Sequence, residues 1–214
     1  ATSSTGPDGV GNPIRIHPGP ANELFLRSTE ADAFAGSEFP LTLSALDSFG
    51  NRLPLSDVER ADLVFFDRFD SIDCNERPSA GAMDAYDFDC VFRTAEVENE
   101  IRAVMPSLGT SGTVGPINVS AGPITQVVIE IDEETRASGA TAGTPFSLSF
   151  EGRDQYGNLG EGTEIVAIDD VGSSISPSEI TMVDGAASET FVSFTALIGN
   201  SVWAWIGDEL VGGT

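Results

Sequence analysis

The sequence contains no lysine, a single histidine and two cysteines among its 214 residues. Without lysine, the chain cannot form the isopeptide cross-links of Gram-positive pilins. His17 is the one imidazole, so a histidine cluster, an HExxH zinc helix and any Ser-His-Asp triad that does not use His17 are excluded. No nucleophile elbow, phosphate-binding glycine loop or dinucleotide fingerprint occurs. We therefore expect that the protein is not an enzyme.

An excess of basic residues and long apolar runs are also missing. Thirty-four acidic residues against ten arginines give a formal net charge of −24. Such a surface repels nucleic acid and anionic lipid, so neither is an expected partner. No apolar run approaches the ~20 residues that span a bilayer, so we expect no membrane insertion. The composition fits a salty habitat, where screening relaxes self-repulsion, and equally a high-GC genome.

Cys74 and Cys90 are the two cysteines, and they lack the paired spacing and the histidines of a zinc site. We predict that they form a disulfide, which favours an oxidising, extracellular setting at the cell surface.

The segment around these cysteines is rich in aspartate. Asp70, Asp73, Asp87 and Asp89 are weak candidates for metal ligands. Ca²⁺ is the cofactor that such a site would bind, because it accepts six to eight oxygen ligands in loose geometry. No EF-hand spacing is present, and a solvated acidic loop is the alternative. We expect no other cofactor.

What is present is a repeat. The phrase AGSEFPLTLSALDSFGN at residues 35–51 recurs as AGTPFSLSFEGRDQYGN at residues 142–158. Short alternating runs separated by Gly, Pro, Asn and Asp predict an all-β chain of two modules, each the size of an immunoglobulin-like sandwich. We predict an N-terminal extension at 1–17, a first domain at 18–120 and a second, incomplete domain at 121–214.

The repeated phrase resembles the "AG.pF.l.v.a.D.yGN" pattern of bacterial immunoglobulin-like repeats of the invasin and intimin type. The resemblance implies two tandem immunoglobulin-like β-sandwiches. Such modules serve in adhesins, surface-layer proteins and stalks, so the resemblance specifies a fold more closely than a task.

The expected strands follow the alternation of apolar and polar residues. We predict one helical turn, at residues 55–62, and no strand after Ile206. The predicted strands are Glu23–Arg27, Phe39–Asp47, Ala61–Phe66, Asp89–Thr94, Glu100–Met105 and Gly115–Val119 in the first domain, and Gln126–Ile131, Phe146–Asp154, Glu164–Ala167, Ser188–Thr195 and Ser201–Ile206 in the second.

A second repeat concerns the strand that closes the first domain. Residues 12–20, NPIRIHPGP, read like residues 115–123, GPINVSAGP. We therefore expect residues 10–16 to form a donor strand that completes the second domain of another copy. Its subunit-interface residues are Val10, Pro13, Ile14 and Ile16.

These patterns predict the structural subunit of an extracellular filament or pilus. It would polymerise head-to-tail with copies of itself by donor-strand complementation, because a heterologous interface that does not close propagates. The alternative is a fragment of a long tandem-repeat adhesin or stalk, in which neighbouring repeats supply the missing strand covalently.

Two further surface features stand out. Trp203 and Trp205 alternate with apolar residues on one predicted strand, so both are expected to face outward as a contact surface, unless the strand has the opposite parity and buries them. A carbohydrate-binding module built on these tryptophans is the second alternative for the function. Asn118 begins the sequon Asn-Val-Ser and is a candidate glycosylation site.

Overall fold

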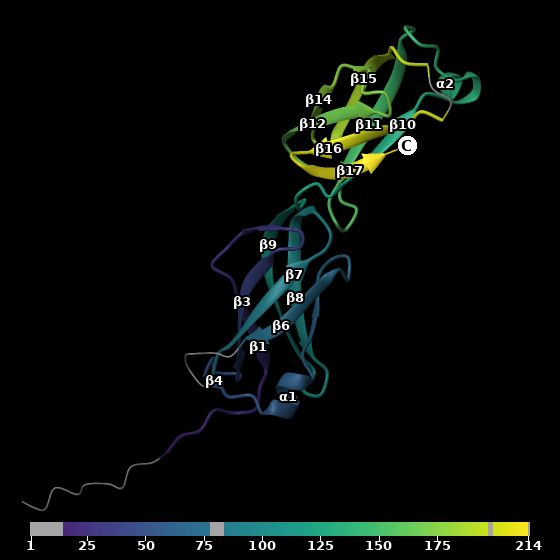
Figure 1. Cartoon of the computed structure of the whole chain (residues 1–214). Helices are drawn as coiled ribbons and strands as arrows, with labels where there is room; N and C mark the ends of the chain where they lie inside the picture. The colour runs from purple at the N-terminus through teal and green to yellow at the C-terminus, as the bar shows by residue number, and fades with distance from the viewer. Residues whose placement is uncertain (1–14, 78–83, 197–198, 214) are drawn as a thin grey trace, which may run out of the picture.

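A computed structural model describes residues 15–77, 84–196 and 199–213. The chain folds into two β-sandwich domains placed end to end, with the N-terminal segment leaving domain 1 at the end away from domain 2 (Figure 1). Domain 1 contains β1 to β9 and domain 2 contains β10 to β17. No helix of the described residues is long and apolar enough to cross a membrane.

Domain 1 has two packed sheets. One runs in the order β1-β3-β7-β6, with β4 beside β3, and the other in the order β2-β9-β8-β5. All pairs are antiparallel except β2 and β9, which run parallel. The strands are β1 (Glu23–Arg27), β2 (Asp32–Phe34), β3 (Glu38–Leu46), β4 (Arg52–Leu53), β5 (Val64–Phe66), β6 (Ile72–Arg77), β7 (Tyr86–Phe92), β8 (Glu96–Met105) and β9 (Thr110–Ser120).

Alternation along these strands makes the core of domain 1. In β7 every second side chain from Tyr86 to Phe92 is buried, and the residues between them are partly exposed. The opposite sheet contributes Ile117 and Val119 from the second half of β9, which are 1% and 3% exposed. This half of β9 therefore closes the core along the edge formed by β2.

Domain 2 follows a similar plan, but its strands pair differently. Its strands follow the order β10-β11-β15-β14-β12-β16-β17, with β13 beside β15, because the β14–β15 hairpin links the two layers. Phe150, Phe191 and Met182 are fully buried between the layers. The strands are β10 (Gln126–Ile131), β11 (Phe146–Arg153), β12 (Thr163–Asp170), β13 (Ile175–Ser176), β14 (Glu179–Val183), β15 (Ala186–Ser193), β16 (Val202–Ile206) and β17 (Glu209–Gly213).

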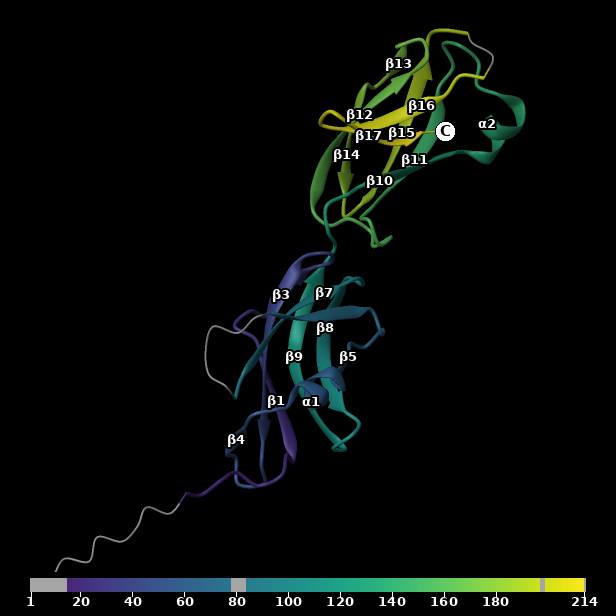
Figure 2. The ribbon, with the colours of Figure 1, turned by 60° about the horizontal axis from the view of Figure 1, so that its bottom comes forward.

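The helical turn predicted at residues 55–62 is present as α1 (Asp57–Ala61), which starts with a capping box between Ser56 and Glu59. A second short helix, α2 (Glu133–Ser138), was not predicted, because its six residues contain no apolar period. In both views α2 lies at the edge of domain 2, outside its strands (Figures 1 and 2).

The prediction that no strand follows Ile206 is wrong. β17 pairs with β16, and it was missed because its sequence ELVGG reads as a turn. Gly212 is required there because a Cβ at this position would lie 2.1 Å from the carbonyl oxygen of Val127. Gly112 on β9 meets the carbonyl oxygen of Leu24 in the same way, at 1.8 Å. β17 is therefore the counterpart of the first half of β9.

Candidate functional site: the domain joint and an open groove

The joint between the domains is built on the turn at residues 154–158. The buried carboxylate of Asp154 accepts hydrogen bonds from the backbone N–H of Tyr156 (2.8 Å) and of Asn158 (3.0 Å). It also accepts from the Asn158 side-chain amide (2.7 Å) and from the N–H of Gly122 in the connection between the domains (3.0 Å). Burial alone would raise the pKa of Asp154, but these hydrogen bonds outweigh it and lower the pKa. The carboxylate thus ties the turn to the connecting chain.

Asn158 also reaches across to domain 1. Its side-chain nitrogen donates to the carbonyl oxygen of Arg93 (2.8 Å), and its Oδ1 accepts from the backbone N–H of Ala95 (3.0 Å). Beside it, the Tyr156 ring packs on Gly36, where a Cβ would lie 3.0 Å from the ring. Gly36 has a φ of 85°, so glycine is favoured there for both backbone conformation and space.

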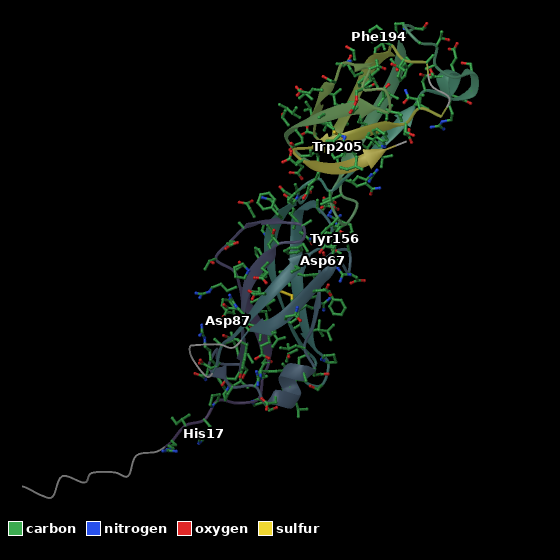
Figure 3. The ribbon with its side chains drawn as sticks, viewed as in Figure 1. His17, Asp67, Asp87, Tyr156, Phe194 and Trp205 are labelled. Carbon is green, nitrogen blue, oxygen red and sulfur yellow. A yellow bond between two sulfur atoms is a disulfide. The ribbon has the colours of Figure 1, made fainter. Side chains whose placement is uncertain are left out.

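The loop at residues 93–95, to which Asn158 bonds, is stabilised through the buried carboxylate of Asp67. Asp67 accepts hydrogen bonds from the N–H and the hydroxyl of Ser71, both at 2.6 Å, and from the Asn99 side chain at 3.3 Å. In turn, the N–H of Arg93 donates to the carbonyl oxygen of Ser71 at 3.0 Å. Asp67 is therefore a structural residue, and it lies toward the junction with domain 2 (Figure 3).

Domain 2 carries the same cluster at its outer end. Asp170 accepts from Ser174 N–H (2.6 Å) and from the side chains of Asn200 (3.0 Å) and Ser193 (2.9 Å). Burial would raise the pKa of Asp170, but these bonds lower it. A buried aspartate thus stabilises the equivalent end of each domain, where the chain leaves β7 in domain 1 and β15 in domain 2.

A groove lies open along one side of domain 2, where domain 1 is closed by the second half of β9. Its volume is about 490 Å³. In domain 1 the backbone of β2 bonds to β9, with Asn118 N–H donating to Ala31 O (2.9 Å) and Ala35 N–H to Ser120 O (2.8 Å). In the described part of domain 2, no strand takes that place. The lining of the groove includes Ile131, Gly139, Ala140, Ala142, Phe146, Leu148, Thr195 and Val202.

Equivalent core residues differ in burial because of this opening. Phe39 of domain 1 is 1% exposed, whereas its counterpart Phe146 is only half-buried. Ile101 is fully buried, and its counterpart Val202 is 9% exposed. The groove is therefore a part of the core of domain 2 that the described residues leave open, with apolar side chains at its base.

The predicted donor strand falls largely outside the described residues, as Val10, Pro13 and Ile14 do. Ile16 is described, and it is 91% exposed in an extended segment that belongs to no strand. Val10 aligns with Thr113 in the first half of β9, and β17 already supplies that stretch in domain 2. The part of the repeat that matches the open groove is therefore residues 13–17.

The predicted disulfide between Cys74 and Cys90 is confirmed, and it joins directly opposed residues of β6 and β7. Trp203 and Trp205 are half-buried on β16, on the face opposite the buried Val202 and Ala204. Asn118 is exposed on β9, where its side-chain nitrogen donates to Asp32 (3.2 Å).

The acidic residues considered as metal ligands each have separate surroundings. Asp73 forms an ion pair with Arg93, and Asp89 forms one with Arg77 at 3.3 Å. Asp87 accepts a hydrogen bond from the Thr42 hydroxyl at 2.9 Å, and Asp70 lies in the Asp67 turn with a φ of 53°. No three histidine, cysteine or acidic side chains of the described residues form a group that could hold a metal ion.

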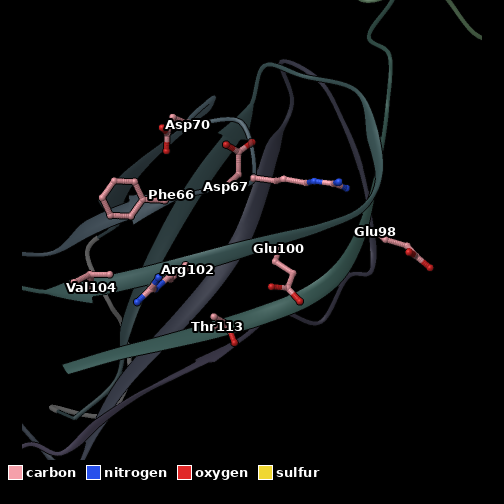
Figure 4. Close-up of a pocket in the computed structure, with 9 residues that line it drawn as sticks. Phe66, Asp67, Asp70, Glu98, Glu100, Arg102, Val104 and Thr113 are labelled. Carbon is pink, nitrogen blue, oxygen red and sulfur yellow. The ribbon is translucent and has the colours of Figure 1, made fainter.

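Sequence reasoning also missed a hollow on the outer face of β5, β8 and β9 in domain 1, with a volume of about 680 Å³. Figure 4 shows Glu100 and Arg102 side by side on β8, with Asp70 above them. Four carboxylates and two arginines line the hollow, so acidic side chains outnumber basic ones there.

The topology and the joint define a pair of tandem immunoglobulin-like domains. No protein-family model matches the sequence, and no curated protein matches it. Among solved structures, the chain is similar to the Escherichia coli adhesin FdeC, with 16% identity and a TM-score of 0.48 over 90% of this chain and 62% of that one. It is also similar to invasin, described as a bacterial integrin-binding protein, with 16% identity and a TM-score of 0.42 over 88% and 37% of the two chains.

Domains 5–6 of the surface-layer protein SbsC are a further similar structure, at 16% identity and a TM-score of 0.32, over 92% of this chain and 96% of that one. The chain thus spans less than two thirds of the FdeC and invasin structures. Invasin, whose repeats the AG phrase of the sequence resembles, is among the structures to which this chain is similar.

Proposed function

We propose that the chain is a structural unit of an extracellular filament that polymerises head-to-tail by donor-strand complementation. Residues 13–17 of one copy fill the groove in domain 2 of the next copy. The observation that carries this proposal is the groove, which stands where domain 1 holds Ile117 and Val119. Ile14 and Ile16 match these two residues in the sequence repeat.

The entry of the chain into each domain supports the same reading. Gly19 N–H donates to Asp47 at 2.9 Å, as Gly122 N–H donates to Asp154 at 3.0 Å. Residues 19–20 therefore approach domain 1 as residues 122–123 approach domain 2. A strand placed just before Gly19 would complete a preceding domain as β9 completes domain 1.

The gains and the ordering cost of insertion are of similar size. Burying two isoleucine side chains contributes about 1.5–3 kcal/mol each, and each ladder hydrogen bond adds about 1 kcal/mol net. Ordering the backbone of five residues costs about 1–2 kcal/mol per residue. The balance is modest, so we expect strand exchange to be measurable in vitro. The disulfide agrees with an extracellular setting.

The test uses a chain that lacks residues 1–17 together with a peptide of residues 12–20. The truncated chain should not polymerise. At one hundred times its Kd the peptide should stabilise domain 2 by about 2.7 kcal/mol, which is a shift of about 11–22 °C in its melting temperature. Tryptophan fluorescence reports this transition selectively, because Trp203 and Trp205 are the two tryptophans of the chain and both lie in domain 2.

Two control peptides sharpen the test. The Arg15→Ala peptide should bind as well as the original, because Arg15 matches the exposed Asn118. A peptide with Ile14→Asp and Ile16→Asp should not bind, because it places carboxylates against the apolar base of the groove. Donor-strand joining would be refuted if the truncated chain polymerised, or if the original peptide left the melting temperature of domain 2 unchanged.

A second candidate is a segment of a long tandem-repeat adhesin or stalk. The observation that favours it is residues 115–123, which close domain 1 and lead into domain 2 within a single chain. In such an array the next repeat would supply the missing strand covalently. After boiling in detergent, a species of 22.4 kDa supports separate subunits, and one much larger chain supports the array.

A further inference from the structure

The internal joint has two complementary faces, and each of them recurs at an outer end of the chain. The face on domain 2 is the turn at residues 154–158, and the face on domain 1 is Gly36 with the loop at residues 93–95. The counterpart of the first face lies at the outer end of domain 1, and that of the second lies at the outer end of domain 2.

The turn at residues 47–51 repeats the first face. Asp47 accepts from the N–H groups of Phe49 and Asn51, both at 2.9 Å, and from the Asn51 side-chain amide at 2.9 Å. In domain 2 the equivalent asparagine also bonds across the joint, but Asn51 has no partner other than Asp47 among the described residues. Phe49, the counterpart of Tyr156, is 86% exposed. This face is fully formed, and none of the described residues covers it.

The outer end of domain 2 repeats the second face. Gly143 N–H donates to Ser193 O at 2.8 Å, as Gly36 N–H donates to Phe92 O at 2.8 Å. Phe194 N–H donates to Ser174 O at 3.3 Å, the same bond that holds the receiving loop of domain 1.

No described residue covers the second face either. Gly143 has a φ of 79°, close to that of Gly36, but no described atom would lie within 4 Å of a Cβ there. The tyrosine that covers Gly36 has no equivalent over Gly143. Phe194 is 67% exposed at the far end of domain 2 (Figure 3).

We propose that the outer end of domain 1 docks on the outer end of domain 2 of a second copy and rebuilds the internal joint. The Asn51 side chain of one copy donates to the carbonyl oxygen of Phe194 in the other and accepts from the N–H of Ala196. The Phe49 ring covers Gly143 and packs against the Phe194 ring. This docking deepens the proposed polymerisation, on which it rests for the pairing of copies, but it uses residues that lie outside the donor strand and the groove.

The joint between copies differs from the internal joint in one respect. Internally, Glu161 accepts from Ala121 N–H at 3.2 Å and Gln155 lies against Gly36. The equivalent positions in domain 1 are Pro54 and Ser48, which supply neither contact. Phe49 takes the place of Tyr156, and Phe194 takes the place of Arg93. Contact between copies therefore depends more on aromatic burial and less on hydrogen bonds.

The direct test places the photo-cross-linking residue p-benzoylphenylalanine at position 49 of the full chain. After irradiation of the assembled protein, mass spectrometry should find the cross-link on residues 141–144 or 193–196 of a second copy. A cross-link to any other site, or none in assembled material, would overturn the proposed docking while leaving strand insertion intact. If no assembly forms at all, both proposals fail.

A matched pair of variants gives the second readout. Asn51→Ala should weaken association of full-length copies about 5- to 30-fold, which corresponds to the loss of two net hydrogen bonds. Asn158→Ala removes the same side chain from the internal joint and should leave the association between copies unchanged. Binding of the peptide of residues 12–20 should be unaffected by Asn51→Ala, because the peptide carries no domain to dock. Equal association of the Asn51→Ala and wild-type chains would refute the docking.

Discussion

Replacing Asn158 with alanine should weaken domain 2 more than the matching replacement of Asn51 weakens domain 1. Each variant loses the amide that bonds an aspartate of its own turn, at 2.7 Å for Asn158 and 2.9 Å for Asn51. Asn158→Ala loses in addition the two bonds across the joint, to Arg93 O and from Ala95 N–H. At about 1 kcal/mol each, these bonds should account for a difference of about 2 kcal/mol in the free energy of unfolding.

The experiment is a urea titration of dilute, unassembled protein. Tryptophan fluorescence follows domain 2 in the Asn158→Ala chain, and circular dichroism follows domain 1 in the Asn51→Ala chain. The Asn51→Ala chain is the control, because it measures how much free energy of unfolding is lost with the bond inside the turn alone. Equal losses in the two variants would mean that the bonds of Asn158 across the joint contribute nothing to the stability of domain 2.

Three other predictions follow from separate features. Replacing Cys74 and Cys90 with serine should lower the stability of domain 1 by about 3 kcal/mol and leave the tryptophan-monitored transition unchanged, and wild-type protein that is denatured without reduction should show no reactive thiol. The Asn51 amide and the Gly19 N–H hold the pKa of Asp47 at about 2, below its usual value of 3.8. The stabilisation by that carboxylate is therefore full above about pH 4 and is lost as pH falls toward about 2, and acid titration of Asp47→Asn should lack this part of the pH dependence. Acrylamide should quench Trp203 and Trp205 partially in the isolated chain and less in the assembly, whereas equal quenching in both would exclude them from any contact between copies.

Much of the fold could be predicted from the alternation of apolar residues. β1 and β10 have the predicted bounds, because β1 alternates between exposed and buried residues and β10 ends immediately before Asp132, which caps α2. β17 could not be predicted, because Gly212 and Gly213 read as a turn until it is known that a Cβ on Gly212 would lie 2.1 Å from the carbonyl oxygen of Val127 on β10. Burial in a strand this short depends on what lies opposite, which no local pattern records.

The site was only partly predictable. The repeat of residues 12–20 located the strand that would fill the groove, and the shared phrase located both turns. The role of Asn158 was not predicted. Hydrogen bonds within the Asp-x-x-Gly-Asn turn are enough to account for an asparagine there, and nothing in the sequence indicates that its amide also bonds to the other domain. The difference between Phe49 and Tyr156 is visible in the sequence, but only the joint shows that it concerns a contact surface.

The connection between the domains has a mechanical consequence. β9 runs directly into Ala121 and Gly122, and a Cβ on Gly122 would lie 2.7 Å from the carbonyl oxygen of Ala35, so no slack segment separates the two sandwiches. Tension along the chain therefore enters domain 1 parallel to β9 and loads its hydrogen bonds to β2 and β8 together, in shear. Bonds loaded in this way break as a group, which raises the barrier to forced unfolding compared with peeling a strand one bond at a time. A chain of such joints would transmit force without first stretching its connections.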